Sequence, residues 1–268
     1  MKIKNALIII SSLLILILGC SQKETNGDDM ALLARVDTIG KEFVDSSSVL
    51  RILIMDSTGY LIVNSIVGDD GSATPNDELA ITTGDLMFPI LLASLGDEID
   101  TSTLMLKAGK KEYNGVLIAD GHFCYDHDSL PVMQALDLHS HVAQTELGWI
   151  FYHDRIDIMK ERIRKMLPGV EFINFYPFEN DSDFLGWCDG CRLRVPLTSL
   201  LKCYSRNDVA AFVHDGCMIS WQATEVDRKE SDICIGYSPD RRYTALIIVS
   251  HNPMPYAVFD KIFRITQK

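Results

Sequence analysis

The chain is short of positive charge, and its lysines and arginines do not cluster. Its 268 residues include 25 Lys and Arg against 37 Asp and Glu, which gives a formal charge of −12 at pH 7. Non-specific affinity for nucleic acid comes from clustered cations that displace counterions from the phosphates. The sequence therefore predicts no nucleic-acid partner.

The sequence also lacks an internal repeat and a linker that would separate two folded domains. Its composition, 47% hydrophobic and 23% charged, is that of a globular protein and excludes disordered and collagen-like chains. A domain of roughly 200 to 250 residues can bury a full core without stapling by disulfides or metals. We therefore expect a single folded domain over residues 30–268.

Residues 1–19 are typical of an export signal. Lys2 and Lys4 precede the apolar run 6–18, which is shorter than the roughly 20 residues needed to span a membrane. The segment that ends in Gly19-Cys20 resembles the cleavage box of bacterial lipoproteins. This resemblance implies cleavage before Cys20, a lipid on its sulfur, and a membrane-anchored protein on the periplasmic or surface face of the cell envelope. The polar residues 20–29 would form a flexible tether.

The seven cysteines are an odd number, and assigning Cys20 to the lipid leaves six whose pairing the sequence cannot rank. Cys188 and Cys191 are separated by two residues and predict either a loop disulfide or two free thiols. Cys217 and Cys234 lie in apolar surroundings, which favour buried free thiols.

Hydrophobic periodicity and turn residues predict the order of elements along the chain. We expect a hairpin over 49–67, short strands within 97–128, and strands at 217–223, 233–237 and 243–250. Helices are expected at 30–45, 85–95, 130–136, 142–147, 154–167, 196–204 and 256–265. Strands at both ends of the chain with helices between them predict an α+β fold, in which helices cover one largely antiparallel sheet.

This order, with several short strings, resembles the transpeptidase domain of penicillin-binding proteins, a serine acyl-transferase fold shared with class A β-lactamases. The strings include Asp-Ser-Thr-Gly at 56–59 and Gly-Tyr-Ser-Pro at 236–239, which lies between two strands. Gly84 and Pro89 also match the residues that flank the family's first motif. The resemblance extends from Met30 to the end of the chain. It implies the β-lactamase/transpeptidase-like fold, no cofactor, and a peptidoglycan peptide or a cell-wall enzyme as partner.

The family's chemistry depends on three motifs, of which the first is a serine followed three residues later by a lysine. The serine hydroxyl needs a nearby base to take its proton as it attacks an acyl carbon. In this chain the serine position is Asp85 and the lysine position is Phe88. A carboxylate in the first turn would complement the helix N-terminus, but neither of these side chains can replace the serine and lysine.

The other two motifs depart in the same way. His139 and His141 stand where the second motif has serine and asparagine, and Trp221 and Ala223 replace the lysine and glycine of the third. Departures at all three motifs predict a pseudoenzyme that has lost acyl transfer and acts by binding or scaffolding in cell-wall processes. An active acyl-transferase with an unrecognised nucleophile remains an alternative.

A second alternative is a thiol-disulfide oxidoreductase, because Trp187-Cys188-Asp189-Gly190-Cys191 resembles the thioredoxin redox motif. That motif opens a helix, whereas residues 192–196 alternate like a strand.

A metal site is a third possibility, because candidate ligands concentrate over a short stretch, but their spacing fits no named zinc pattern and we predict no metal. These residues are Asp120, His122, Cys124, Asp126, His127, Asp128, His139 and His141.

Overall fold

The computed structural model describes residues 27–43, 49–68, 73–121, 127–175, 180–213, 216–226, 229–250 and 254–264. It divides the chain into two compact units, Met1–Arg35 and Val36–Lys268. Helix α2 (Gly27–Phe43) begins in the first unit and ends in the second, and it confirms the helix expected at 30–45. The export signal and Cys20 lie outside the described residues. Within the described ranges, no helix combines the length and the apolar character that crossing a membrane requires.

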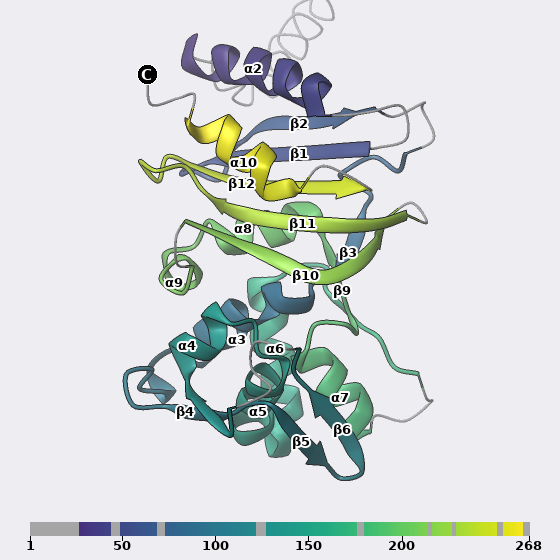
Figure 1. The fold of residues 1–268 in the computed structure, drawn as a ribbon, viewed down its shortest axis with the longest axis vertical. Coiled ribbons are helices and arrows are strands. Elements are labelled where there is room, and N and C mark those ends of the chain that lie inside the picture. Colours follow the sequence, from purple (N-terminus) through teal and green to yellow (C-terminus); the bar gives the residue numbers. More distant parts are fainter. Residues whose placement is uncertain are drawn as a thin grey trace, which may run out of the picture. The chain divides into compact units, whose positions relative to one another are not determined.

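One five-stranded antiparallel sheet dominates the second unit, with the strand order β10-β11-β12-β1-β2 (Figure 1). The pairing of β1 with β12 joins the N-terminal hairpin to the C-terminal strands, which confirms the predicted sheet. The strands are β1 (Val49–Asp56), β2 (Leu61–Val67), β10 (Cys217–Val226), β11 (Lys229–Tyr237) and β12 (Tyr243–Ser250).

Helices cover both faces of this sheet. Helix α8 (Leu197–Tyr204) packs against β1, β11 and β12, and α10 (Pro255–Arg264) packs against β11 and β12 from the opposite face (Figure 1). All eight residues of β12 are buried. A strand covered on both sides reads as a continuous apolar run rather than an alternating one, as the sequence of β12 does.

The middle of the chain forms a helical half built around α3 (Met87–Leu95). This helix is apolar on every side and packs against α5, α6, α7 and α9, which is the environment that an all-apolar helix requires. The surrounding helices are α4 (Val132–Asp137), α5 (His141–Tyr152), α6 (Ile156–Met166), α7 (Asp181–Cys188) and α9 (Asn207–Ala210).

Short strands complete the helical half, as expected for residues 97–128. Strand β4 (Met105–Lys107) pairs with β7 (Ser129–Pro131), and β5 (Lys110–Tyr113) forms a hairpin with β6 (Val116–Ala119). Because β7 takes up the first residues of the helix expected at 130–136, α4 begins only at Val132. A small sheet contains β3 (Ala80–Thr82), β9 (Leu193–Pro196) and β8 (Glu171–Phe172). Strand β9 confirms the strand-like alternation of residues 192–196, whereas β3 and β8 were not predicted.

The two halves meet at the edge of the large sheet. Strand β10 is an edge strand, and it packs against η1 (Gly84–Leu86), the short 3-10 helix that leads directly into α3. The start of the central helix therefore lies beside the sheet edge, and the candidate site is built there.

Candidate functional site

A buried carboxyl group occupies the junction between the two halves. Asp85 lies in η1, and its side chain is only 2% exposed. The junction is held from the sheet side by α8, because the Tyr204 hydroxyl donates a 2.8 Å hydrogen bond to the carbonyl of Leu86. Asp85 is therefore fixed at the point where η1 meets the sheet edge.

Two imidazoles face this carboxyl group. His139 Nδ1 lies 3.8 Å from Asp85 Oδ2, and His141 Nε2 lies 3.4 Å from Asp85 Oδ1. The histidine side chains are 21% and 23% exposed, so they connect the buried carboxyl group to the surface. The structure thus brings together the positions assigned to the first two motifs, which are 54 residues apart in the sequence.

The loop that carries the histidines is held by Asp120. The carboxylate of Asp120 accepts hydrogen bonds from the Gly109 amide at 2.7 Å, the Ser140 hydroxyl at 2.8 Å and the Val142 amide at 2.9 Å. Ser140 in turn caps α5, because its oxygen accepts from the Ala143 amide at 3.0 Å. Asp120, considered from sequence as a metal ligand, positions this loop.

Asp189 completes the cluster from α7. Its Oδ1 lies 2.7 Å from His141 Nδ1, and it follows directly after the last residue of α7. The next residue, Gly190, has φ +80° and packs so tightly that a Cβ there would lie 2.6 Å from the carbonyl oxygen of Gly84. The 3.2 Å hydrogen bond from the Thr83 amide to the Gly190 carbonyl fixes the same contact.

The electrostatic surroundings shift the pKa values of the two imidazoles in opposite directions. Burial lowers the pKa of His141, but the hydrogen bond to Asp189 and the charges of Asp189 and Asp85 outweigh burial and raise it to about 9. For His139, burial outweighs the nearby charge of Asp85 and lowers its pKa below the usual 6.5. At neutral pH the site therefore holds one protonated and one neutral imidazole on a single carboxyl group.

The remaining motif positions fall in different environments. Trp221 and Ala223 lie in β10, in a stretch where the pairing with β11 is irregular between Ser220 and Thr224. Their strand borders η1. Phe88 is 1% exposed and belongs to the hydrophobic core around α3, so the residue at the lysine position contributes to packing.

The two cysteines of the possible redox motif are free thiols. Cys188 is fully buried at the end of α7, and burial raises its pKa far above the usual value; burial also raises the pKa of Cys191 to about 11. A redox cysteine needs a stabilised thiolate, typically at a helix N-terminus. This environment opposes the oxidoreductase alternative. Cys234 is a free thiol as well and is buried as expected, whereas Cys217 is only partly buried.

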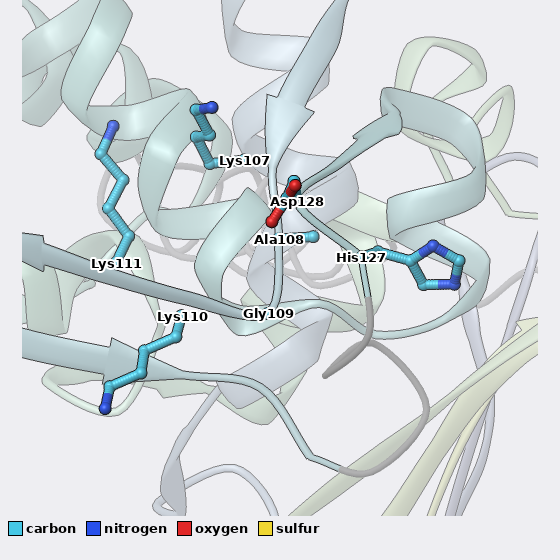
Figure 2. A pocket seen from close by; sticks show the side chains of 7 residues that line it. All are labelled: Lys107, Ala108, Gly109, Lys110, Lys111, His127 and Asp128. Carbon is cyan, nitrogen blue, oxygen red and sulfur yellow. The ribbon is translucent and has the colours of Figure 1, made fainter.

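Among the described residues, no group of three or more His, Cys, Asp and Glu side chains is placed to hold a metal ion. His122, Cys124 and Asp126 lie outside the described ranges. His127 and Asp128 line a hollow of about 370 Å³, together with residues 107–111. Figure 2 shows that the lysines and the histidine around this hollow point in different directions, so they do not converge on one ligand.

Two solved structures resemble this fold over most of its length. The transpeptidase (TP) domain of penicillin-binding protein 3 from Burkholderia pseudomallei matches with a TM-score of 0.63 and 13% identity, covering 92% of this chain and 97% of its own. A peptidoglycan glycosyltransferase from Burkholderia ambifaria matches with a TM-score of 0.61 and 14% identity, covering 89% and 93%. No family model and no curated protein matches the sequence. The likeness confirms the predicted transpeptidase-like fold.

Proposed function

We propose that this chain, which has the fold of a penicillin-binding protein transpeptidase domain, is a lipid-anchored cell-envelope protein that acts in cell-wall processes by binding, without serine acyl transfer. The observation that carries the proposal is the environment of Asp85, which faces His139 and His141 at the start of the central helix. Serine acyl transfer needs a hydroxyl and a base at that place. Two structural neighbours of the chain, a penicillin-binding protein domain and a peptidoglycan glycosyltransferase, support the link to the cell wall.

Asp85 is a poor substitute for the serine. A carboxylate that attacks an amide would form an anhydride, and the neighbouring Phe88 supplies neither a proton nor a positive charge. His141 is held between Asp85 and Asp189, and Ser140 uses its hydroxyl to bond Asp120 and to cap α5. With His141 and Ser140 held in these contacts, no side chain that the structure describes at the motif positions is placed to act as the nucleophile of acyl transfer.

Binding is compatible with the same residues. The candidate ligands are a peptidoglycan stem peptide, bound at the site, and an active cell-wall enzyme, docked on the domain. Binding of a peptide carboxylate is favoured by a permanent cation, and the sequence has Trp221 where that lysine is expected. The loss of this charge lowers affinity for a carboxylate and favours a protein partner.

The test is to incubate the mature protein with a β-lactam and measure its mass. We expect an unchanged mass, while an active serine transpeptidase treated in parallel gains one β-lactam. A stoichiometric adduct on this chain would overturn the proposal, because it would reveal a working nucleophile. Crosslinking in cells, followed by identification of the bound species, then distinguishes a peptidoglycan peptide from a cell-wall enzyme.

A further inference from the structure

Two cysteines lie next to each other on adjacent strands of the large sheet (Figure 1). Cys217 is the first residue of β10, and the register pairs it with Gly236 of β11. Cys234 lies two residues before Gly236, and residues two apart in a strand share one face. We infer that Cys217 and Cys234 are a redox site, at which exchange with an external disulfide forms a bond that fastens β10 to β11. This modification goes beyond the proposed function, which assigns no role to either cysteine.

A glycine brings the two strands close enough for this bond. Diagonal neighbours in a regular sheet have Cα atoms about 7 to 8 Å apart, just beyond the usual range of about 4.4 to 6.8 Å for a disulfide. A Cβ added to Gly236 would lie 2.5 Å from the Cβ and 2.7 Å from the Cα of Cys217, whereas Cβ atoms of a regular pair are about 4.5 to 5.5 Å apart. The start of β10 therefore lies over the face of β11, which shortens the path between the two sulfurs.

The two thiols already interact. They are hydrogen-bonded to each other, and this hydrogen bond, together with burial, raises the pKa of Cys234 well above its usual value. Cys234 therefore keeps its proton, and Cys217 is the more exposed of the two. The first exchange accordingly takes place at Cys217, and Cys234 is the thiol that completes the bond.

The pair at the end of α7 is arranged differently, although it is closer in sequence. The Cys188 sulfur lies 4.0 Å from the sulfur of Met159, and the Cys191 thiol donates to the Gly186 carbonyl at 3.6 Å. These two thiols therefore contact different groups. Among the described cysteines, the geometry thus favours the pairing between β10 and β11, which the sequence could not rank.

The reaction balances with one external disulfide as the oxidant. The Cys217 thiolate attacks one sulfur of that disulfide, forms a mixed disulfide and releases the first external thiol. Cys234 then gives up its proton and attacks the Cys217 sulfur, and the second external thiol leaves. The two cysteines lose two electrons and two protons, which the external disulfide gains as two thiols. Disulfides persist in oxidising envelope compartments, where the proposed export would place the chain.

The bond would support β10 at an edge of the sheet. The strand has β11 as its neighbour, and its pairing is irregular between Ser220 and Thr224. It also borders η1, which carries Asp85. The two cysteines are 17 positions apart in the chain, and closing such a loop restricts the unfolded state. The oxidised protein should therefore resist unfolding better than the reduced protein.

The test incubates the reduced mature protein with excess oxidised glutathione, alkylates the remaining thiols and maps the peptides by mass spectrometry. We expect a bond between Cys217 and Cys234 with no glutathione on either. The matched control, Cys191→Ser, removes an exposed thiol elsewhere and should form the same bond. Alkylation of both cysteines, or glutathione retained on Cys217 in the wild-type protein, would overturn the inference.

Two variants test the order of the steps. Cys234→Ala should retain glutathione on Cys217, because the thiol that completes the bond is missing. Cys217→Ser should leave Cys234 without glutathione, because the buried thiol does not react first. The reverse pattern would refute the assigned roles.

Urea unfolding shows whether the bond fits the folded sheet. Oxidation should shift the midpoint of the wild-type protein to a higher urea concentration and leave that of Cys217→Ser unchanged. A midpoint that stays the same or falls on oxidation of the wild-type protein would contradict a bond formed between the paired strands.

Discussion

At the scale of single residues, the charge of His141 depends on one neighbour above all. Asp189 makes the 2.7 Å contact to Nδ1, and Asp85 is farther away at 3.4 Å. An opposite charge at this distance shifts a pKa by about 1 to 3 units. Asp189→Asn should therefore lower the pKa of His141 from about 9 by about 1 unit or more. An NMR titration of the imidazole measures the shift.

Asp208→Asn is the matched control, because it removes a carboxylate that pairs with Arg206 instead. An unchanged His141 pKa in Asp189→Asn would contradict the assigned contact. Stability gives a second readout, since the pKa of His141 is higher in the folded state than the unfolded value of about 6.5. Its contribution is fully present below about pH 6.5 and is lost as the pH rises through 9. The free energy of unfolding should decrease less over this interval in Asp189→Asn.

Sequence reasoning found only part of this site. Asp85, His139 and His141 could be named because they occupy the positions of known motifs. Asp189 appeared only as a spacer between two cysteines, since its contact joins residues 48 positions apart and no local pattern records it. Phe88 occupies a motif position as well. The motif, a serine followed three residues later by a lysine, identifies this position but does not show that Phe88 is buried in an all-apolar helix.

At the scale of elements, the packing of α5 against α7 depends on a glycine. A Cβ on Gly148 would lie 2.2 Å from the Cys188 sulfur, which is fully buried and has little room to move. Overpacking of this kind costs about 1 to 3 kcal/mol, which exceeds the helix propensity of up to about 1 kcal/mol that alanine gains over glycine. Gly148→Ala should therefore lower the free energy of unfolding, as measured by urea titration.

A second substitution identifies the cause. Removing the sulfur with Cys188→Ala in the same chain should restore part of the stability that Gly148→Ala loses. Gly121→Ala is the control, because nothing lies within 4 Å of the added Cβ. If Gly148→Ala unfolds at the same urea concentration as the wild-type protein, the packing of these helices is looser than described.

Elements with a clear period or a strong turn were predictable, and those without were missed. The hairpin of β1 and β2 was found from branched apolar residues around a turn, where the Asp56 carboxylate accepts hydrogen bonds from the amide and the hydroxyl of Thr58. Helix α7 was missed because six of its eight residues are buried, which removes the contrast between faces. Its N-cap was readable, since the Asn180 side chain accepts from the Asp183 amide.

At the scale of the whole molecule, the sheet depends on pairing between distant parts of the chain. Strand β1 pairs with β12 along all eight residues, from Val49 with Ser250 to Asp56 with Tyr243. The sheet is therefore incomplete until the C-terminal strands are present. Segregation of the strands to the two chain ends predicted this arrangement, but the contact between β10 and η1 that creates the site depends on tertiary packing.

The proposed anchoring also belongs to this scale, because it decides where the whole chain resides. A lipid on Cys20 would hold the protein at the membrane through its buried acyl chains, each CH₂ contributing about 0.8 kcal/mol. We expect Cys20→Ala to move the protein from the membrane fraction to the soluble fraction and to abolish labelling by palmitate. Cys191→Ala, which removes an exposed thiol of the folded domain, should leave both unchanged. If Cys20→Ala remains in the membrane fraction, or the wild-type protein retains residues 1–19 without lipid, the lipoprotein proposal is wrong, while the arrangement of Asp85 and its two histidines does not depend on the lipid.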